Sequence, residues 1–299
     1  MTIIELLETS PTLVLVISVV LGLLVGSFLN VVIYRLPIML QRDWRAQCCE
    51  YLELDNSIPD KNSTSSKYTE FNLQKPASHC PQCNHKIRPW ENIPVVSYVL
   101  LGGKCANCKS KISLRYPAIE FVTGVLSGLV AISFGFSWLT LALLLLTWSL
   151  IALTLIDFDH QLLPDDITLP ILWLGLLVNA LDLGFGVLLY DAVIGAIAGY
   201  LVLWGFYWAF KLATGKEGMG YGDFKLLAAF GAWMGWQSLL PIVIISSLVG
   251  AVFGLVMIVF QGRDKSVPMP FGPYLAGAGF IMLIWGPQIN ALYYNSVAG

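Results

Sequence analysis

Several long stretches of this chain contain no charged residue. Residues 11–34 form the first of them, and roughly 20 residues suffice for a helix to cross the hydrocarbon core of a bilayer. Only 12% of all residues are charged, against about a quarter in soluble domains, and 57% are hydrophobic. The sequence therefore predicts an all-α integral membrane protein. Because 17 Lys and Arg nearly balance 19 Asp and Glu, the net charge gives no reason to expect a nucleic-acid partner.

The uncharged stretches predict about eight transmembrane helices. Residues 11–34 are too long and too poor in basic flanks for a signal peptide, so we expect them to stay as the first span. Residues 121–156 are long enough for two spans, with a turn at residues 133–137. The remaining spans are expected at 167–189, at 192–210, at 226–261 as two helices that meet near Gln237 and Ser238, and at 273–293.

The positions of the basic residues predict the orientation of these spans. Twelve of the 17 Lys and Arg lie between Arg35 and Arg115, and an eight-span arrangement puts the other five on the same side. Because basic residues collect in cytoplasmic loops, we expect both termini outside the cytoplasm. The expected cytoplasmic loops are 35–116, 157–166, 211–225 and 262–272.

This arrangement predicts three parts of the chain. Residues 1–34 form the first span, and residues 35–116 form a cytoplasmic loop. Within the loop, residues 42–75 are polar and low in complexity, so we expect a flexible insertion there. Residues 117–299 form the main membrane domain with about seven spans.

Four cysteines of the cytoplasmic loop form two C-x-x-C pairs separated by 21 residues: Cys80, Cys83, Cys105 and Cys108. Paired knuckles of this kind hold tetrahedral zinc, although this spacer is slightly longer than usual. Disulfides are disfavoured in the cytoplasm, so we favour zinc over free or redox-active thiols. Four thiolates leave no open coordination position, which predicts a structural zinc subdomain. His79 and His85 flank the first pair, and we interpret Cys48 and Cys49 as incidental thiols.

Three aspartates at the expected cytoplasmic border are candidates for chemistry. Asp157 ends the third expected span and Asp223 begins the sixth, so the two can meet although they are far apart in sequence. Asp159 lies two residues after Asp157, nearly opposite on a helix, so only one of the two faces a partner well. Asp165 and Asp166 begin the fourth expected span, where we expect them to cap the helix.

Two facing carboxylates that share a proton can hydrolyse a peptide bond, as in aspartic peptidases. Residue types alone leave open a pair that binds ions, couples protons in a transporter or closes helix ends. Asp223 ends a run of alternating glycines at 218–223, which we expect to permit unusual backbone angles and close approach of another segment.

Five motifs occur in one order along nearly the whole chain. They are GSFLNVVIYRLP at 26–37, the paired C-x-x-C knuckles, RYP at 115–117, D-x-D-x-x-LLPD at 157–165 and GMGYGDFK at 218–225. With these motifs the chain resembles the bacterial type IV prepilin peptidases, apart from the insertion at 42–75. The resemblance implies a multi-pass enzyme of the bacterial cell inner membrane, a membrane aspartic peptidase of the GxGD type with its active site at the cytoplasmic face.

The resemblance also implies substrates and cofactors. The family removes the leader of type IV prepilins and of type II secretion pseudopilins after a glycine, then N-methylates the new N-terminal residue with S-adenosylmethionine. Membrane lipid and the pilus or secretion assembly machinery are the other expected partners.

Family motifs imply individual roles as well. The second catalytic aspartate falls on Asp223, and the first falls on Asp157, seven residues before Pro164, with Asp159 as the fallback. Gly103 and Lys104 lie in the region that resembles the family's methylation region. They can equally be a turn glycine and a solvated cation beside a zinc ligand.

Two other classes of function predict different outcomes. A carboxylate-dependent transporter is expected to show two related halves with broken helices, and the sequence shows no such repeat. A membrane-tethered zinc module that only recruits partners predicts that both aspartates are dispensable.

Overall fold

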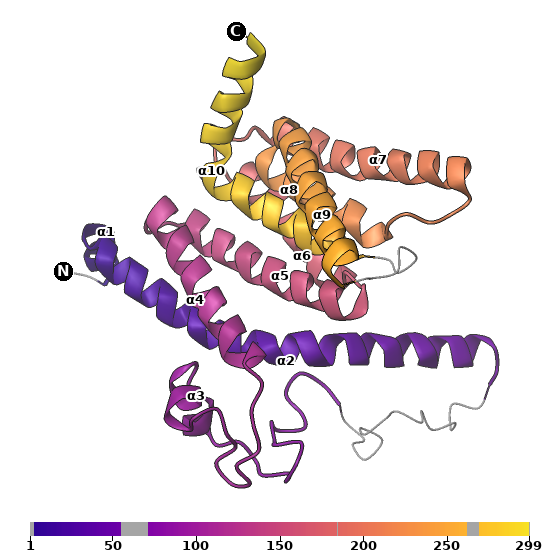
Figure 1. Ribbon diagram of the computed structural model, residues 1–299. Coiled ribbons are helices and arrows are strands. Elements are labelled where there is room, and N and C mark those ends of the chain that lie inside the picture. The colour runs from indigo at the N-terminus through magenta and orange to yellow at the C-terminus, as the bar shows by residue number, and fades with distance from the viewer. Residues whose placement is uncertain (1–2, 55–70, 184, 262–268, 299) are drawn as a thin grey trace. The chain divides into compact units, whose positions relative to one another are not determined.

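The computed structural model describes residues 3–54, 71–183, 185–261 and 269–298, and within these ranges it contains helices and no β-strand (Figure 1). The helices are α1 Ile3–Thr9, α2 Pro11–Tyr51, α3 Val96–Leu100, α4 Arg115–Phe134, α5 Trp138–His160, α6 Asp165–Ala180, α7 Leu189–Thr214, α8 Tyr221–Met234, α9 Leu239–Gln261 and α10 Gly272–Ala298, with 3-10 turns η1 Pro89–Asn92 and η2 Trp236–Ser238. The predicted all-α class is therefore confirmed for the described residues.

Internal contacts divide the chain into two compact units. One unit is Leu15–Gly128, and the other joins Met1–Val14 to Leu129–Gly299. The first contains most of α2 and α4 together with the cysteine-bearing loop. The second contains the helices from α5 to α10.

Five helices are long and apolar enough to cross a membrane: Pro11–Tyr51, Arg115–Phe134, Trp138–His160, Leu189–Thr214 and Trp236–Met257. A membrane protein is thus supported, but the full set of eight spans is not confirmed. The fourth and sixth expected spans correspond to α6 and α8, which have only 16 and 14 residues. Both are shorter than the roughly 20 residues that an unassisted crossing needs.

The two breaks predicted inside long uncharged stretches are present. Between α4 and α5 the chain turns at Gly135, which has a φ of 65°, and Ser137 caps α5 by accepting a hydrogen bond from the Thr140 N–H at 3.1 Å. Between α8 and α9 it turns at Gly235, whose φ is 75°, before η2. Positive φ angles are accessible to glycine at little cost, which explains why the helices end there.

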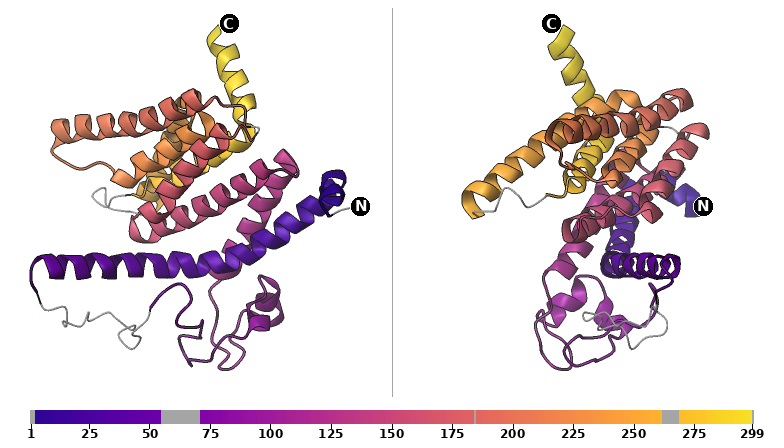
Figure 2. Two further views of the ribbon diagram at one scale, coloured as in Figure 1. Left: turned by 180° about the vertical axis from the view of Figure 1, so that it is seen from behind. Right: turned by 90° about the vertical axis from the view of Figure 1, so that its right-hand side faces the viewer.

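Part of the expected flexible insertion is helical. α2 continues as one helix through residues 42–51 to Tyr51 (indigo in Figure 2). These residues are polar, but they include Gln, Arg, Ala and Glu and contain no Gly or Pro, so their helix propensity is good. Cys48 and Cys49 lie in this extension with free thiols. Residues 55–70 of the insertion lie outside the described part of the chain.

α8 is short because it is a core helix. Every residue from Asp223 to Met234 is buried, apart from the half-buried Lys225, and α8 packs on both α6 and α7. The contact with α7 is a close glycine approach, because a Cβ added at Gly195 or at Gly231 would overlap the opposite backbone. On the α6 side the Trp233 indole N–H donates to the Ile171 carbonyl at 2.8 Å.

In the unit Leu15–Gly128, α2 and α4 also meet through small residues. A Cβ at Gly22 would overlap Ser127, and one at Gly26 would lie 2.7 Å from the Glu120 Cα. Asn30 adds a hydrogen bond from its side-chain amide to the Tyr116 carbonyl at 3.3 Å. Small residues that let backbones approach closely are typical of helix pairs in membranes.

Candidate active site and metal site

The structure brings Asp157 and Asp223 together. Asp157 lies in the last turn of α5 and Asp223 in the first turn of α8, and the charge on one carboxylate acts on the other. Their exposed fractions are only 6% and 5%. Two buried carboxylates that act on each other in this way cannot both carry a charge cheaply, so one of the two is suited to stay protonated.

Backbone N–H groups hold one oxygen of each carboxylate. The Gly272 N–H, at the start of α10, donates to Asp157 Oδ2 at 3.0 Å. The Gly220 N–H donates to Asp223 Oδ2 at 3.3 Å. Asp223 Oδ1 is buried and has no hydrogen-bond partner among the described residues. A buried polar atom without a partner is costly, so this oxygen is available for a shared proton, a water molecule or a substrate.

Leu163 lies against two glycines of the site. A Cβ on Gly222 would lie 2.6 Å from the Leu163 Cβ. A Cβ on Gly272 would lie 2.6 Å from Asp157 Oδ2 and 3.2 Å from Leu163 Cδ1. The starts of α8 and α10 therefore approach Leu163, and α10 also approaches Asp157, only because Gly222 and Gly272 lack side chains.

The glycine run at 218–223 behaves only partly as predicted. Close approach is present at Gly222. Unusual backbone angles are absent, because none of the glycines of this described run has a positive φ, and Gly220 has a φ of −84°. Within the run, Gly222 is needed for space, because a Cβ there would overlap Leu163.

The neighbouring aspartates lie elsewhere. Asp159 is exposed, as its position two residues after Asp157 predicts. Asp165 and Asp166 lie in the first turn of α6, but the capping position is Pro164, without a side-chain cap. Instead, the Lys225 ammonium donates to Asp165 Oδ1 at 2.6 Å and to Oδ2 at 2.7 Å. Asp165 therefore forms an ion pair between α6 and α8 instead of the predicted helix cap.

Gly272 is a site residue that the sequence reasoning missed. Its contribution is a backbone N–H group, which leaves no signature in residue type, and it lies 115 residues from the carboxylate it contacts. The available signal was the Phe271-Gly272-Pro273 sequence at the start of the last span, where a small residue stands at a helix N-terminus.

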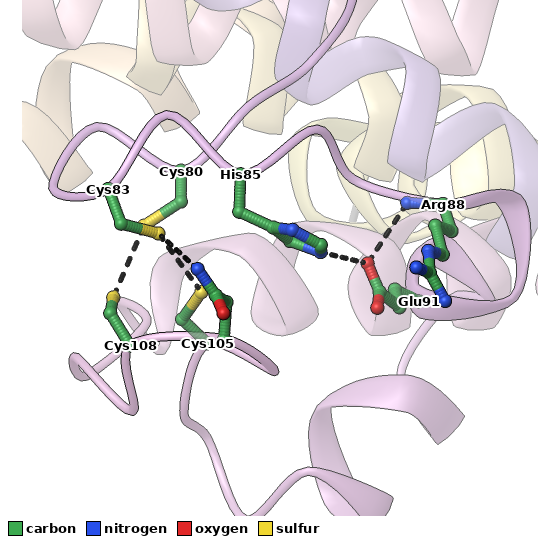
Figure 3. Close-up of polar contacts among 8 residues, drawn as sticks. Cys80, Cys83, His85, Arg88, Glu91, Cys105 and Cys108 are labelled. Carbon is green, nitrogen blue, oxygen red and sulfur yellow. Dashed lines mark hydrogen bonds and ion pairs between the residues drawn. The ribbon is translucent and has the colours of Figure 1, made fainter.

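In the other unit, the four cysteines predicted as metal ligands form one cluster. Their sulfurs all lie within 4.8 Å of one another, with Cys80 and Cys108 3.8 Å apart and Cys83 and Cys105 4.0 Å apart (Figure 3). Four sulfurs bound at about 2.3 Å to one tetrahedral zinc ion stand about 3.8 Å from one another. The cluster therefore fits a single tetrahedral metal ion.

Both cysteine pairs are built alike, as a repeat with an offset of 25 residues. The Cys80 N–H donates to the His85 carbonyl, and the Cys105 N–H donates to the Ser110 carbonyl. A left-handed residue follows the second cysteine of each pair, with a φ of 55° at Asn84 and 60° at Lys109. Each knuckle thus turns back on itself and directs both thiols to one point.

Two of the four thiols, Cys80 and Cys108, favour the thiolate form that metals require, whereas the pKa of the Cys83 thiol is raised. N–H groups of Cys83 and Gln82 hydrogen-bond the Cys80 sulfur and lower the pKa of that thiol to about 6. On the second knuckle, the Ser110 hydroxyl and backbone lower the pKa of the Cys108 thiol. The Ser110 Oγ lies 3.1 Å from the Cys108 sulfur. Such surrounding hydrogen bonds orient metal ligands.

His85 does not join the cluster. Its Nε2 lies 3.2 Å from Glu91 Oε2, which also accepts the Arg88 N–H at 3.0 Å (Figure 3). The Arg88 N–H, and after it His85, hold the pKa of the Glu91 carboxyl below its usual range. This contact ties the first knuckle to the η1 turn that follows it.

A cavity of about 710 Å³ adjoins the knuckles within the same unit. Gly103 lies behind one of its walls: its φ is 69°, and a Cβ there would lie 2.8 Å from the hydroxyl of Tyr98, which lines the cavity. Lys104 is exposed.

Comparisons with known proteins also divide the chain into two parts. Residues 20–134 match the bacterial peptidase A24 N-terminal domain, and residues 144–255 match the type IV leader peptidase family. A prepilin leader peptidase/N-methyltransferase of Stutzerimonas stutzeri is 56% identical over 98% of both chains. The chain belongs to the type IV leader peptidase family. Proteins of the same name from Pseudomonas aeruginosa and Neisseria gonorrhoeae are 53% and 54% identical, the first over 98% of both chains and the second over 89% of this chain and 88% of its own. No solved structure matches the chain.

The four cysteines lie within the range of the first family model, and Asp157 and Asp223 lie within that of the second. The resemblance inferred from the five motifs is thereby confirmed.

Proposed function

We propose that this protein cleaves the leader peptides of type IV prepilins and type II secretion pseudopilins after a glycine, and then N-methylates the new N-terminal residue. The observation that carries the peptidase half is the buried pair Asp157 and Asp223 inside the range matched by the leader peptidase family. The name of the relatives, identical at 53–56% over nearly the whole chain, supports both halves.

The carboxylate pair performs the hydrolysis as one unit. One carboxylate is ionised and takes a proton from the attacking water, while the other is protonated and polarises the scissile carbonyl. The Gly272 N–H fixes Oδ2 of Asp157, and the Gly220 N–H fixes Oδ2 of Asp223. Asp223 Oδ1, which has no partner among the described residues, is the oxygen that contacts the attacking water or the scissile carbonyl.

We place the reaction at the cytoplasmic border of the bacterial inner membrane, in a protein of about eight spans with both termini outside the cytoplasm. The distribution of basic residues supports this orientation. α10, α6 and α8, which are not among the five candidate spans, would complete the eight, α6 and α8 as helices of only 16 and 14 residues. The peptidase then occupies residues 117–299, and the cytoplasmic loop 35–116, with the ends of the two helices that flank it, carries the second activity.

Zinc is the metal we propose for the four thiolates of Cys80, Cys83, Cys105 and Cys108. The sulfur separations match a tetrahedral site, and a site closed by four thiolates has a structural role. S-adenosylmethionine, when bound, supplies a methyl group on a sulfonium sulfur. The metal-bound knuckles stabilise the walls of the adjoining cavity. Gly103 contributes by leaving room for the side chain of Tyr98, which lines the cavity. Lys104 is exposed, and its contribution to methyl transfer is its positive charge.

Cleavage by single Asp-to-Asn variants tests the proposal. Purified wild-type protein, Asp157→Asn, Asp159→Asn and Asp223→Asn are incubated with a prepilin in lipid vesicles, and the product is read by mass spectrometry. We expect cleavage to fall by at least about 10²-fold in the 157 and 223 variants and to persist in the 159 variant.

The wild-type product is expected to carry one added methylene mass when S-adenosylmethionine is supplied. Normal cleavage by both the 157 and 223 variants would overturn the peptidase assignment and favour a transporter or a recruiting module instead.

A further inference from the structure

We infer that the cavity beside the zinc knuckles receives the new N-terminal amine of the cleaved substrate, and that the Glu120 carboxylate binds this amine during methyl transfer. The inference rests on the proposed methyltransferase function. It adds a location and a residue that neither the family motifs nor the relatives' names assign. The cavity lies wholly within the unit Leu15–Gly128 and measures about 710 Å³, a size typical of small-ligand sites.

Glu120 is the least exposed carboxylate of the cavity wall. It lies in the second turn of α4, its exposed fraction is 8%, and it lines the cavity. Its Oε2 accepts the Val95 N–H at 2.8 Å, and Oε1 has no donor within the described chain. A buried carboxylate at the start of a candidate membrane span is costly unless it serves a function. A positively charged or hydrogen-bond-donating ligand would satisfy it.

Val95 supports a functional reading of this contact. Its backbone has a φ of 60° and a ψ of −47°, which is unfavourable for a β-branched residue. Backbone strain of this kind persists only where neighbouring groups hold it, and it concentrates at functional sites. The Glu120 carboxylate is the group that holds the Val95 N–H, so the loop between the knuckles is fixed around this side chain.

The composition of the lining distinguishes the substrate amine from other cations. Part of the lining comes from two candidate membrane helices, among them Val31 of α2 and Pro117 of α4, the helix that carries Glu120. Another part comes from polar knuckle residues such as Gln82 and Ser110. The substrate amine heads an apolar membrane segment and suits the helical part, while the polar methyl donor suits the part formed by the knuckles.

Methyl transfer balances with Glu120 as a charge-stabilising group. About one α-amino group in ten is neutral at pH 7, and in this form it donates an N–H to Glu120 Oε1 and directs its lone pair at the donor methyl group. A nitrogen–carbon bond forms while the carbon–sulfur bond breaks, so the sulfonium becomes a thioether. The positive charge moves to the nitrogen, where the carboxylate stabilises it. The methylated ammonium then loses a proton to water.

Glu120→Gln tests this role, because glutamine keeps the size of the side chain and a carbonyl that accepts the Val95 N–H but removes the charge. The full-length protein is given S-adenosylmethionine and a pre-cleaved pilin, so that methylation does not depend on cleavage. We expect the methyl-transfer kcat to fall about 10²-fold while the KM for S-adenosylmethionine, the metal content and cleavage of intact prepilin stay unchanged.

Glu50→Gln is the control, because it also removes one carboxylate from the same unit. Glu50 is exposed in the α2 extension and is not among the residues that line the cavity. We expect this variant to methylate within a few-fold of wild type. Wild-type methylation by Glu120→Gln, or an equal loss in both variants, would overturn the assignment to Glu120. Absence of methylation by the wild-type protein would instead refute the proposed function.

A second measurement uses only wild-type protein, in case Glu120→Gln fails to fold. A carbodiimide joins a carboxylate to an amine that touches it. The wild-type protein is mixed with pre-cleaved pilin and treated with the carbodiimide. We expect this treatment to join Glu120 to the pilin N-terminus, as mapped by mass spectrometry. An N-acetylated pilin should give no such product. Coupling of the pilin N-terminus to other carboxylates without Glu120 would contradict the inference.

Discussion

At the scale of single residues, the peptidase site depends on positions without side chains. Gly222 and Gly272 leave room for Leu163 and for the Asp157 carboxylate, so three chain segments meet at van der Waals distance. Gly220 belongs to the same glycine run, but a Cβ there would come no closer than 3.9 Å to Asp223 Oδ2. The two glycines of the GxGD motif therefore have different roles.

Alanine substitution separates these roles. In Gly222→Ala the new methyl group would lie 2.6 Å from the Leu163 Cβ, so α8 must shift and Asp223 moves with it. Because small displacements of reacting groups are costly, we expect cleavage to fall about 10²-fold. Gly220→Ala has room and an ordinary φ of −84°, so it should cleave within a few-fold of wild type. The measurement is the rate of prepilin cleavage, and equal activity of both variants would contradict this account.

At the scale of elements, α8 is positioned by its packing on α7. Gly195 and Gly231 bring the two helices to backbone contact, and Gly199 does so one turn further along. This packing explains how a helix of 14 residues is buried on nearly all sides. It also fixes the position of Asp223, which lies in the first turn of α8.

Gly195→Ala tests the helix contact. The added methyl group would overlap the Gly231 carbonyl, so the helices must separate. We expect a clearly lower thermal unfolding temperature, corresponding to about 1–3 kcal/mol of overpacking. Gly205→Ala is the control on the same helix, because nothing lies within 4 Å of its Cβ position. That variant should unfold at the wild-type temperature or slightly above it, and a lower temperature for it than for Gly195→Ala would exclude the packing argument.

The loop between the knuckles offers a second matched pair. Gly102 and Gly103 both have left-handed φ angles, 61° and 69°, so alanine strains the backbone similarly at each. Only at Gly103 would the methyl group also displace a side chain, that of Tyr98 in the cavity wall. We expect Gly103→Ala to lower methyl transfer at least about tenfold more than Gly102→Ala, with normal cleavage in both. Methylation assays on pre-cleaved pilin measure this difference, which equal losses would disprove.

At the scale of the whole molecule, the two candidate sites belong to different compact units. The four cysteines and the cavity lie in Leu15–Gly128, whereas both aspartates lie in the unit that contains Leu129–Gly299. Each site is assembled by contacts within its own unit. The two activities are therefore expected to be separable.

Metal removal tests this separation. We expect Cys80→Ser, or chelation of the wild-type protein, to lower both the zinc content and methyl transfer, since the knuckles support the cavity walls. Prepilin cleavage should persist. Cys48→Ser, at a thiol in the α2 extension, is the control and should keep one metal ion per chain. Full methyl transfer by a metal-free protein would show that the metal does not support this activity.

Sequence reasoning predicted the helical class, the breaks at residues 133–137 and near Gln237, and a four-cysteine cluster, because glycine turns and ligand spacings are local signals. It did not distinguish α8 from a membrane span, since residues buried in protein and residues facing lipid are equally apolar. It also missed the Gly272 N–H and the Glu120 contact with Val95. Both are contacts between side chains and distant backbone groups, which residue types do not encode.

The central claim is that one chain carries two separable reactions, with cleavage dependent on the buried aspartate pair. The most direct measurement is mass spectrometry of products made by Asp223→Asn, given S-adenosylmethionine and either intact prepilin or pre-cleaved pilin. We predict that the prepilin stays intact and that the pre-cleaved pilin gains one methylene mass at the wild-type rate. Cleaved prepilin, or a pre-cleaved pilin left unmethylated, would contradict the account.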